Sequence, residues 1–118
     1  MQSALRQFKA ELFRALGHPT RLALLEVLGT GDYTVTALQQ ALRLDNSAVS
    51  QQLAVLRTRG IVEGIKEGTA VRYHLRDRRI LDLLAITREI FLQQLSAMQS
   101  AVDDDVVQPL REGLNPSQ

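Results

Sequence analysis

The sequence predicts a mainly α-helical protein with one small β-hairpin, and residues 35–75 carry the observations behind this prediction. Apolar residues at helical spacing indicate a short helix over 35–42 and, after a tight turn, a second helix over about 46–59. Two strands follow over 61–66 and 70–75 around Glu67-Gly68-Thr69, where a glycine can supply the positive φ of a reversal. This order of elements is typical of a winged helix-turn-helix.

The second predicted helix has one apolar and one polar side. Val49, Leu53 and Leu56 fall at i, i+4 and i+7, so they form a stripe that packs on the domain. Amides and hydroxyls opposite this stripe can donate to and accept from base edges, and arginines near the helix end can pair with phosphates. On an isolated helix such residues are most often a solvated face. Followed by a hairpin, they predict a DNA-binding surface made of Asn46, Ser47, Ser50, Gln51, Gln52, Arg57, Lys66 and Arg72.

The hairpin, residues 61–75, is the predicted wing. Lys66 lies on its first strand and Arg72 on its second, with Arg72 and His74 on the face opposite Val71 and Tyr73. A basic turn is by itself an ordinary sheet edge. Directly after a helix of this kind, it indicates a wing that contacts a phosphate backbone while the helix enters the major groove.

Charge is distributed unevenly along the chain. The formal net charge is only +1, but residues 57–79 hold seven Lys and Arg against three acids, whereas residues 80–118 hold two Arg against six acids. The first segment therefore carries +4 and the second −4. This separation gives one part of a nearly neutral molecule the positive field that phosphate attraction requires.

Length and composition suggest one small domain. With 118 residues, 45% of them apolar, the chain can build one core, and a chain this short gains from burying surface in a partner. It contains no cysteine, so no disulfide, thiolate metal site or thiol redox switch is available. Its apolar runs are short, and its beginning lacks a signal segment, so we expect a cytoplasmic protein without membrane insertion.

The remaining segments are expected to form scaffold and dimer interface. Residues 77–102 contain neither Gly nor Pro and predict one long helix with two apolar faces, one for its own domain and one for a second copy. The first helix is expected to pack alongside, which gives a homodimer through the N- and C-terminal helices. The predicted interface residues are Leu5, Phe8, Leu84, Phe91, Leu95 and Met98. We expect residues 1–102 to form the DNA-binding and dimerisation domain, and 103–118 a loosely ordered acidic tail.

Four segments resemble the ArsR/SmtB family of winged-helix transcriptional regulators: FRALGHPTRLALLEVL (13–28), VTALQQAL (35–42), NSAVSQQLAVL (46–56) and GIVEGIKEGTAVRYHL (60–75). They occur in the family's order and spacing. The resemblance implies a homodimer whose recognition helices enter successive major grooves of a partly palindromic operator. It further implies repression of transcription until an effector lowers the affinity.

The sequence departs from the metal-sensing members of that family. Thr34 and Thr36 stand where metalloid sensors carry thiolates, and Leu84, Leu95 and Met98 replace ligands of the long-helix site if Asp82 aligns with its first ligand. His18, before Pro19, is expected to be a local cap, and His74 to face solvent or phosphate. The adjacent carboxylates of residues 103–105 point in different directions on a helix and suit a solvated helix end. We therefore predict no metal site and no cofactor.

Three functions of different class remain open. The first is a sequence-specific DNA-binding regulator, most simply a repressor. Its action on transcription would be controlled by a small-molecule effector, by a protein effector or by the amount of regulator present. The second is a winged helix that serves as a protein-interaction module, and the third a metal sensor, for nickel for example, with an atypical O/N site. No catalytic residues are predicted, because the chain lacks a phosphate loop, a Cys nucleophile and a grouping of Ser, His and Asp.

Overall fold

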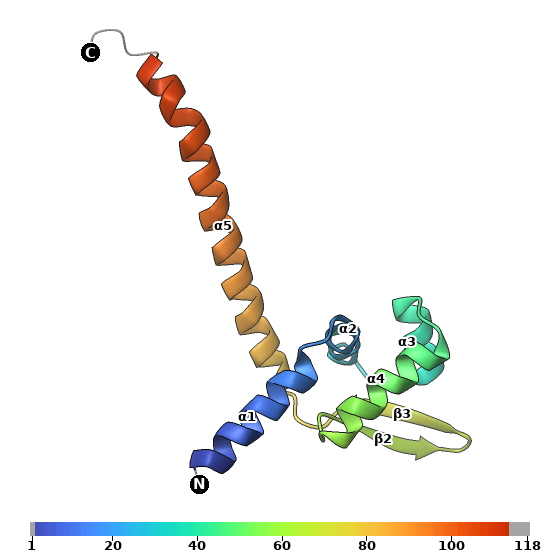
Figure 1. Cartoon of the computed structure of the whole chain (residues 1–118). Helices are drawn as coiled ribbons and strands as arrows, with labels where there is room; N and C mark the ends of the chain where they lie inside the picture. The colour runs from blue at the N-terminus through green and yellow to red at the C-terminus, as the bar shows by residue number, and fades with distance from the viewer. Residues whose placement is uncertain (1, 114–118) are drawn as a thin grey trace. The chain divides into compact units, whose positions relative to one another are not determined.

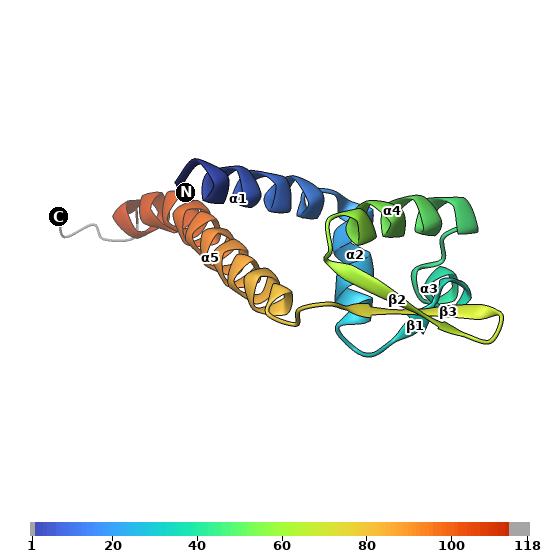
Figure 2. The same ribbon diagram turned by 90° about the horizontal axis from the view of Figure 1, so that it is seen from below.

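The computed structural model describes residues 2–113, with side chains through residue 105. It divides into two compact units, the first ending at Leu81 and the second beginning at Asp82. Figures 1 and 2 show the elements in chain order. They are α1 (Gln2–Leu16), α2 (Pro19–Leu28), β1 (Tyr33–Thr34), α3 (Val35–Leu42), α4 (Asn46–Thr58), β2 (Val62–Glu67), β3 (Ala70–Leu75) and α5 (Ile80–Gly113).

Each of the helices α2, α3 and α4 begins at a side chain that accepts a hydrogen bond from its first turn. His18 Nδ1 accepts from a backbone N–H at 3.2 Å, Thr34 Oγ1 does so at 3.2 Å and Asp45 Oδ1 at 2.7 Å. The orphan N–H groups of a helix start are thereby partly satisfied. The prediction that His18 is a local cap is confirmed.

The turn between α3 and α4 is short because one residue reverses the chain. Arg43 adopts a left-handed conformation with φ of 55°, and both its N–H and that of Leu44 donate to the carbonyl of Gln39. This αL closure of a helix end leaves only two further residues before α4. The two helices of the helix-turn-helix are thus held close in space.

A three-stranded antiparallel sheet in the order β1-β3-β2 replaces the predicted two-stranded hairpin. The additional strand, Tyr33–Thr34, pairs with Tyr73 and Arg72 of β3. Two residues are too few to show a period of two, so the sequence pattern could not reveal this strand. The hairpin turn is Gly68-Thr69, one residue shorter than expected, and Gly68 supplies the positive φ of 60°.

The core lies among α2, α3, α4 and the base of the hairpin. The predicted stripe of Val49, Leu53 and Leu56 is at most 2% exposed. It packs in a core with Ala15, Leu16, Leu24, Leu25, Leu28, Leu38, Ile61, Val62, Leu75 and Ile80. None of the polar or charged side chains described is buried. The prediction of the inward side of α4 is therefore confirmed.

The long helix differs from its predicted range at both ends. Residues 77–79 form a turn in which Asp77 Oδ1 accepts from the N–H of Arg79 at 2.9 Å, and α5 begins at Ile80. Hydrogen bonds from the Arg79 side chain and backbone lower the pKa of Asp77 to about 2.

The predicted end of this helix at Val102 is wrong, because residues 103–113 are helical. Residues 103–108 contain neither Gly nor Pro, so nothing in the sequence stops the helix there. The division into a domain of residues 1–102 and a tail remains a prediction, and its last five residues, 114–118, lie outside the described part. Within residues 2–113, none of the helices combines the length and apolar character of a membrane span.

We expect Asp45→Ala to lower the free energy of unfolding by about 1 kcal/mol, because it removes the cap of α4. Chemical denaturation measures this loss. Asp32→Ala is the matched control, since Asp32 is also an exposed acid but no hydrogen bond to its side chain occurs in the described structure. An equal effect of the two substitutions would contradict a capping role.

Candidate nucleic-acid interface

Helix α4 presents a polar face opposite its buried stripe. At about 100° per residue, Ser47, Gln51 and Thr58 lie opposite Val49 and Leu53, and all three are exposed. Pairs four residues apart are hydrogen-bonded along the helix: the amide nitrogen of Gln51 donates to Ser47 Oγ at 3.3 Å. These bonds hold the polar side chains against the helix without burying them.

Asn46 and Ser50 form a second such pair beside this face. Ser50 Oγ donates to Asn46 Oδ1 at 3.1 Å, and the Asn46 amide nitrogen lies 3.4 Å from Gln39 Oε1 on α3. Ser50 is half-buried whereas Asn46 is exposed. Four of the predicted DNA-binding residues therefore lie together at the start of α4 as two neighbouring pairs.

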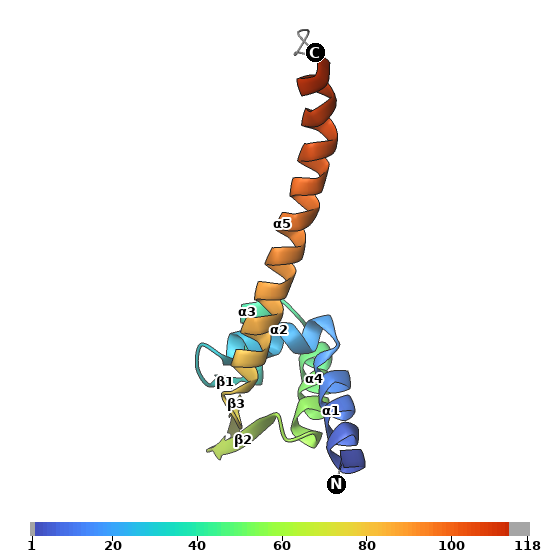
Figure 3. The ribbon, with the colours of Figure 1, turned by 90° about the vertical axis from the view of Figure 1, so that its left-hand side faces the viewer.

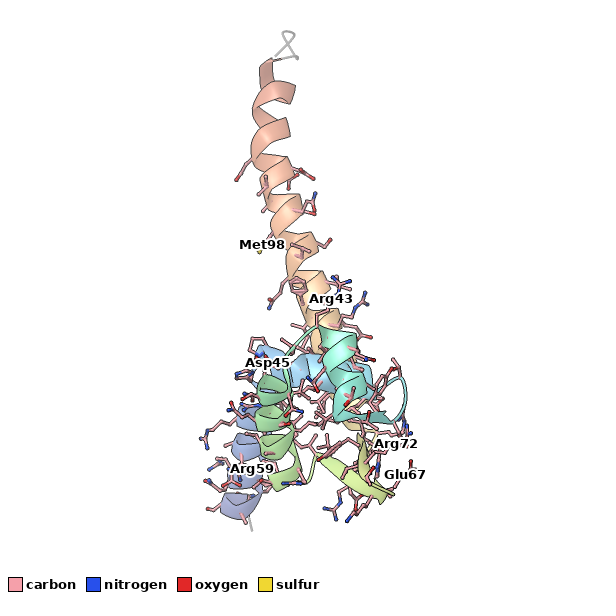
Figure 4. The ribbon with its side chains drawn as sticks, turned by 90° about the vertical axis from the view of Figure 1, so that its right-hand side faces the viewer. Arg43, Asp45, Arg59, Glu67, Arg72 and Met98 are labelled. Atoms are coloured by element: carbon pink, nitrogen blue, oxygen red, sulfur yellow. The ribbon has the colours of Figure 1, made fainter. Side chains whose placement is uncertain are left out.

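Helix α4 lies between two flanking elements. Figures 3 and 4, seen from opposite sides, both place it between α1 and the β2–β3 hairpin. An ion pair of 3.1 Å between Arg59 and Glu11 joins the end of α4 to α1. A helix flanked in this way can enter a groove while its neighbours approach the backbone on either side.

Gln52 does not lie on the polar face. It is half-buried on the flank of α4, and its side-chain oxygen accepts a hydrogen bond from Arg21 Nη1 at 3.1 Å. The sequence predicts Gln52 as part of the DNA-binding surface, and the structure places it beside Arg21 of α2, which also contacts the end of α1. Its partner Arg21 was missed, although a basic residue just after the end of a helix is a recognisable signal for pairing with terminal carbonyls.

The two cations of the wing point to opposite faces of the hairpin. Lys66 is the cross-strand partner of Val71, and Arg72 that of Ile65, so the alternation of side chains separates them. Arg72 Nε donates to Glu67 Oε2 at 3.1 Å, and its Nη1 donates to the carbonyl of Asp32 at 3.4 Å. Figure 4 labels Arg72 and Glu67 on the hairpin. The structure therefore does not bring Lys66 and Arg72 together.

His74, which is expected to face solvent or phosphate, lies beside an acidic side chain and is 25% exposed. Its Nε2 lies 3.3 Å from Glu63 Oε2, the residue opposite it in the sheet. The face of the hairpin that carries Arg72 thus holds two acid–base pairs across its strands. Ion pairs near the surface contribute little to the free energy of folding. A phosphate can therefore replace Glu67 beside Arg72 with little loss of stability.

The other cations of residues 57–79 occupy several environments. Arg57 is exposed in the last turn of α4, as predicted for a phosphate-contacting group. Arg78 donates to the carbonyl of Gly29 at 3.0 Å, and Arg79 forms a 2.6 Å ion pair with Asp77. The seven cations are therefore spread over the end of α4, the wing and the segment between β3 and α5.

Five of the six predicted dimer-interface residues are exposed within the single chain. Phe8 is 62% exposed and Met98 66%, Leu5, Phe91 and Leu95 are also exposed, and Leu84 is half-buried. Large apolar side chains rarely remain open to water in such number without a partner.

Among the described side chains, no group of three or more His, Cys, Asp and Glu could hold a metal ion.

Comparison with known proteins agrees with this architecture. Residues 18–64 match the model of the family described as bacterial regulatory protein, arsR family. The HTH-type transcriptional regulator Rv0081 of Mycobacterium tuberculosis is 37% identical over 101 residues, which cover 85% of this chain and 89% of that protein. Its crystal structure has a TM-score of 0.73 and covers 80% of this chain and 95% of that one, at 38% identity.

Two further relatives carry informative names. The biofilm growth-associated repressor of Xylella fastidiosa is 35% identical over 85 residues, 72% of this chain and 75% of that protein. A Mycobacterium bovis structure described as a homodimeric winged helix-turn-helix DNA-binding domain has a TM-score of 0.73 and 27% identity. It covers 81% of this chain and 89% of that one. The chain belongs to the ArsR family of bacterial transcriptional regulators and has its winged helix-turn-helix fold.

Proposed function

We propose that a homodimer of this chain binds a partly palindromic operator in double-stranded DNA and represses transcription. Helix α4 enters the major groove, where Ser47, Ser50 and Gln51 contact base edges, and the β2–β3 wing contacts the phosphate backbone. Such a regulator acts in the cytoplasm, where bacterial DNA lies.

The polar face of α4 is the observation that carries this proposal. Ser47 and Gln51 are exposed and Ser50 beside them is half-buried; all three are hydrogen-bonded along the helix and backed by a buried apolar stripe, so the helix presents donors and acceptors on a fixed support. The major groove is wide enough for one α-helix and offers a distinct donor and acceptor pattern for each base pair. The flanking hairpin offers Arg72 on one face and Lys66 on the other for contacts to the backbone.

The apolar side chains exposed on α1 and α5 support a dimer. Phe91, Leu95 and Met98 follow one another at spacings of four and three residues, which is the pattern of a helix-helix seam. Two copies related by a two-fold axis present two α4 helices, and this symmetry matches a palindromic site. The M. bovis relative is described as homodimeric, and the X. fastidiosa relative as a repressor.

Selection of bound fragments from random-sequence duplexes tests the proposal directly. We expect enrichment of one motif with two inverted half-sites about one helical turn apart. The protein with Gln51→Ala, Arg57→Ala and Arg72→Ala combined, which keeps the core and the apolar seam, is the matched control and should enrich nothing. Recovery of no motif by the wild-type protein, even at low salt, would contradict the proposal.

Replacing Gln51 by Ala should relax sequence preference, with a loss of about 1–3 kcal/mol on the preferred site, because a bidentate contact to a base edge disappears. Ser50→Ala should act in the same direction. Competition between the selected duplex and a scrambled duplex measures the preference. Full selectivity in both variants would show that another face reads the bases.

Arg72→Ala should weaken binding to every sequence to a similar degree and make the salt dependence shallower by about one phosphate. Glu67→Gln should strengthen binding to every sequence, because Arg72 no longer has a competing carboxylate 3.1 Å away. Glu63→Gln, which removes the same charge beside His74, is the control. An unchanged salt slope in the Arg72 variant would place the hairpin away from the DNA.

Phe91→Glu should dissociate the dimer, because a charge buried without a partner in an interface costs several kcal/mol. Phe91 is 56% exposed in the single chain, so the charge is tolerated in the monomer and unfolding is not expected. Light scattering measures the mass, with Gln93→Glu, on the opposite side of α5, as the control. A Phe91→Glu dimer of wild-type stability would place the interface elsewhere.

A further inference from the structure

Three helices meet at the guanidinium of Arg21. It lies in the first turn of α2 and donates from Nε to the carbonyl of Ala15 at 2.7 Å and from Nη2 to that of Arg14 at 3.3 Å. These carbonyls belong to the last turn of α1, where backbone acceptors lack partners within the helix. Its Nη1 donates to the side-chain oxygen of Gln52 on α4 at 3.1 Å.

This contact fixes which way the Gln52 amide points. A guanidinium has five donors and no acceptor, so only the oxygen of the amide can face it. The NH₂ group of Gln52 must then point away from Arg21. Ordinarily a glutamine can turn either its donor or its acceptor outward, but with its oxygen held toward a cation, Gln52 turns its NH₂ donors to its other surroundings.

The position of Gln52 differs from that of the base-reading face. It lies about 100° around the helix from Gln51 and two turns before Arg59, whose ion pair with Glu11 marks the flank of α4 that faces α1. A helix in the major groove has base edges at its centre and phosphates at its two sides. The wing occupies one side of α4, and the side of Gln52 is the other.

We propose that Gln52 donates a hydrogen bond to a DNA phosphate and that Arg21 is the positioning residue that orients it for this contact. The inference rests on the proposed function and adds a backbone contact on the flank opposite the wing. The guanidinium 3.1 Å away also polarises the amide and contributes positive charge near the phosphate. The three hydrogen bonds of Arg21 also connect the end of α1 to the recognition helix, so a movement of α1 would move Gln52.

Gln52→Glu separates this role from a structural one. The carboxylate keeps an acceptor for Arg21, so thermal stability should equal or exceed that of the wild type, but it has no donor. Affinity for a random-sequence duplex should fall about tenfold while sequence preference stays unchanged. Gln40→Glu, which places the same charge on an exposed site of α3, is the matched control and should have a much smaller effect.

Gln52→Met removes the donor without adding charge. Its affinity for the same duplex should also fall, but with an unchanged salt slope, since a neutral donor releases no counterion. In the wild type, the NMR signal of the Gln52 side-chain amide should shift when the duplex is added, and in Arg21→Ala this shift should disappear. A merely structural contact predicts no shift in either protein.

The outcomes separate the two proposals. If the wild type binds the duplex and Gln52→Glu binds as well, or if Gln40→Glu loses as much affinity, the inference is overturned and the proposed function stands. Wild-type affinity in Gln52→Met would also overturn it, because charge alone would then explain the glutamate variant. A wild-type protein that binds no duplex at low salt would overturn both.

Discussion

Burial of Val49, Leu53 and Leu56 fixes the rotation of α4 about its own axis, and the other functional features depend on this constraint. The three side chains are almost completely buried, so turning the helix would expose apolar surface at about 25 cal/mol per Å². The polar side of α4 is therefore always the outer side. Asp45 sets where the helix begins, and the left-handed Arg43 sets how closely it follows α3.

Two further contacts fix α4 relative to α1. Arg21 joins Gln52 to the terminal carbonyls of α1, and Arg59 pairs with Glu11. If α1 lies in the dimer interface, the arrangement of the two subunits determines the distance and orientation between the two recognition helices. The spacing of half-sites that the dimer accepts then follows from these bonds. An effector that moves α1 by a small amount would change that spacing, which is one physical route to regulation.

The sequence predicted the helices well because their signals repeat over many residues. The stripe in α4, the cap at His18 and the turn at Gly68 each have a local physical cause that can be recognised without coordinates. The missed features depend on residues distant in sequence. The strand Tyr33–Thr34 exists through its pairing with β3, and the orientation of Gln52 depends on Arg21, 31 residues earlier. Likewise, Lys66 and Arg72 look equivalent until the register separates them.

A titration of the isotope-labelled protein with its selected duplex, followed by NMR, tests most directly which surface meets DNA. The largest changes should fall on Ser47, Gln51 and the side chains flanking them on α4, and on the hairpin around Arg72. Residues of the buried stripe and of the apolar seam on α5 should change little. Changes confined to α1 or α5, with the polar face of α4 unaffected at saturation, would contradict the assignment of α4 as the recognition helix.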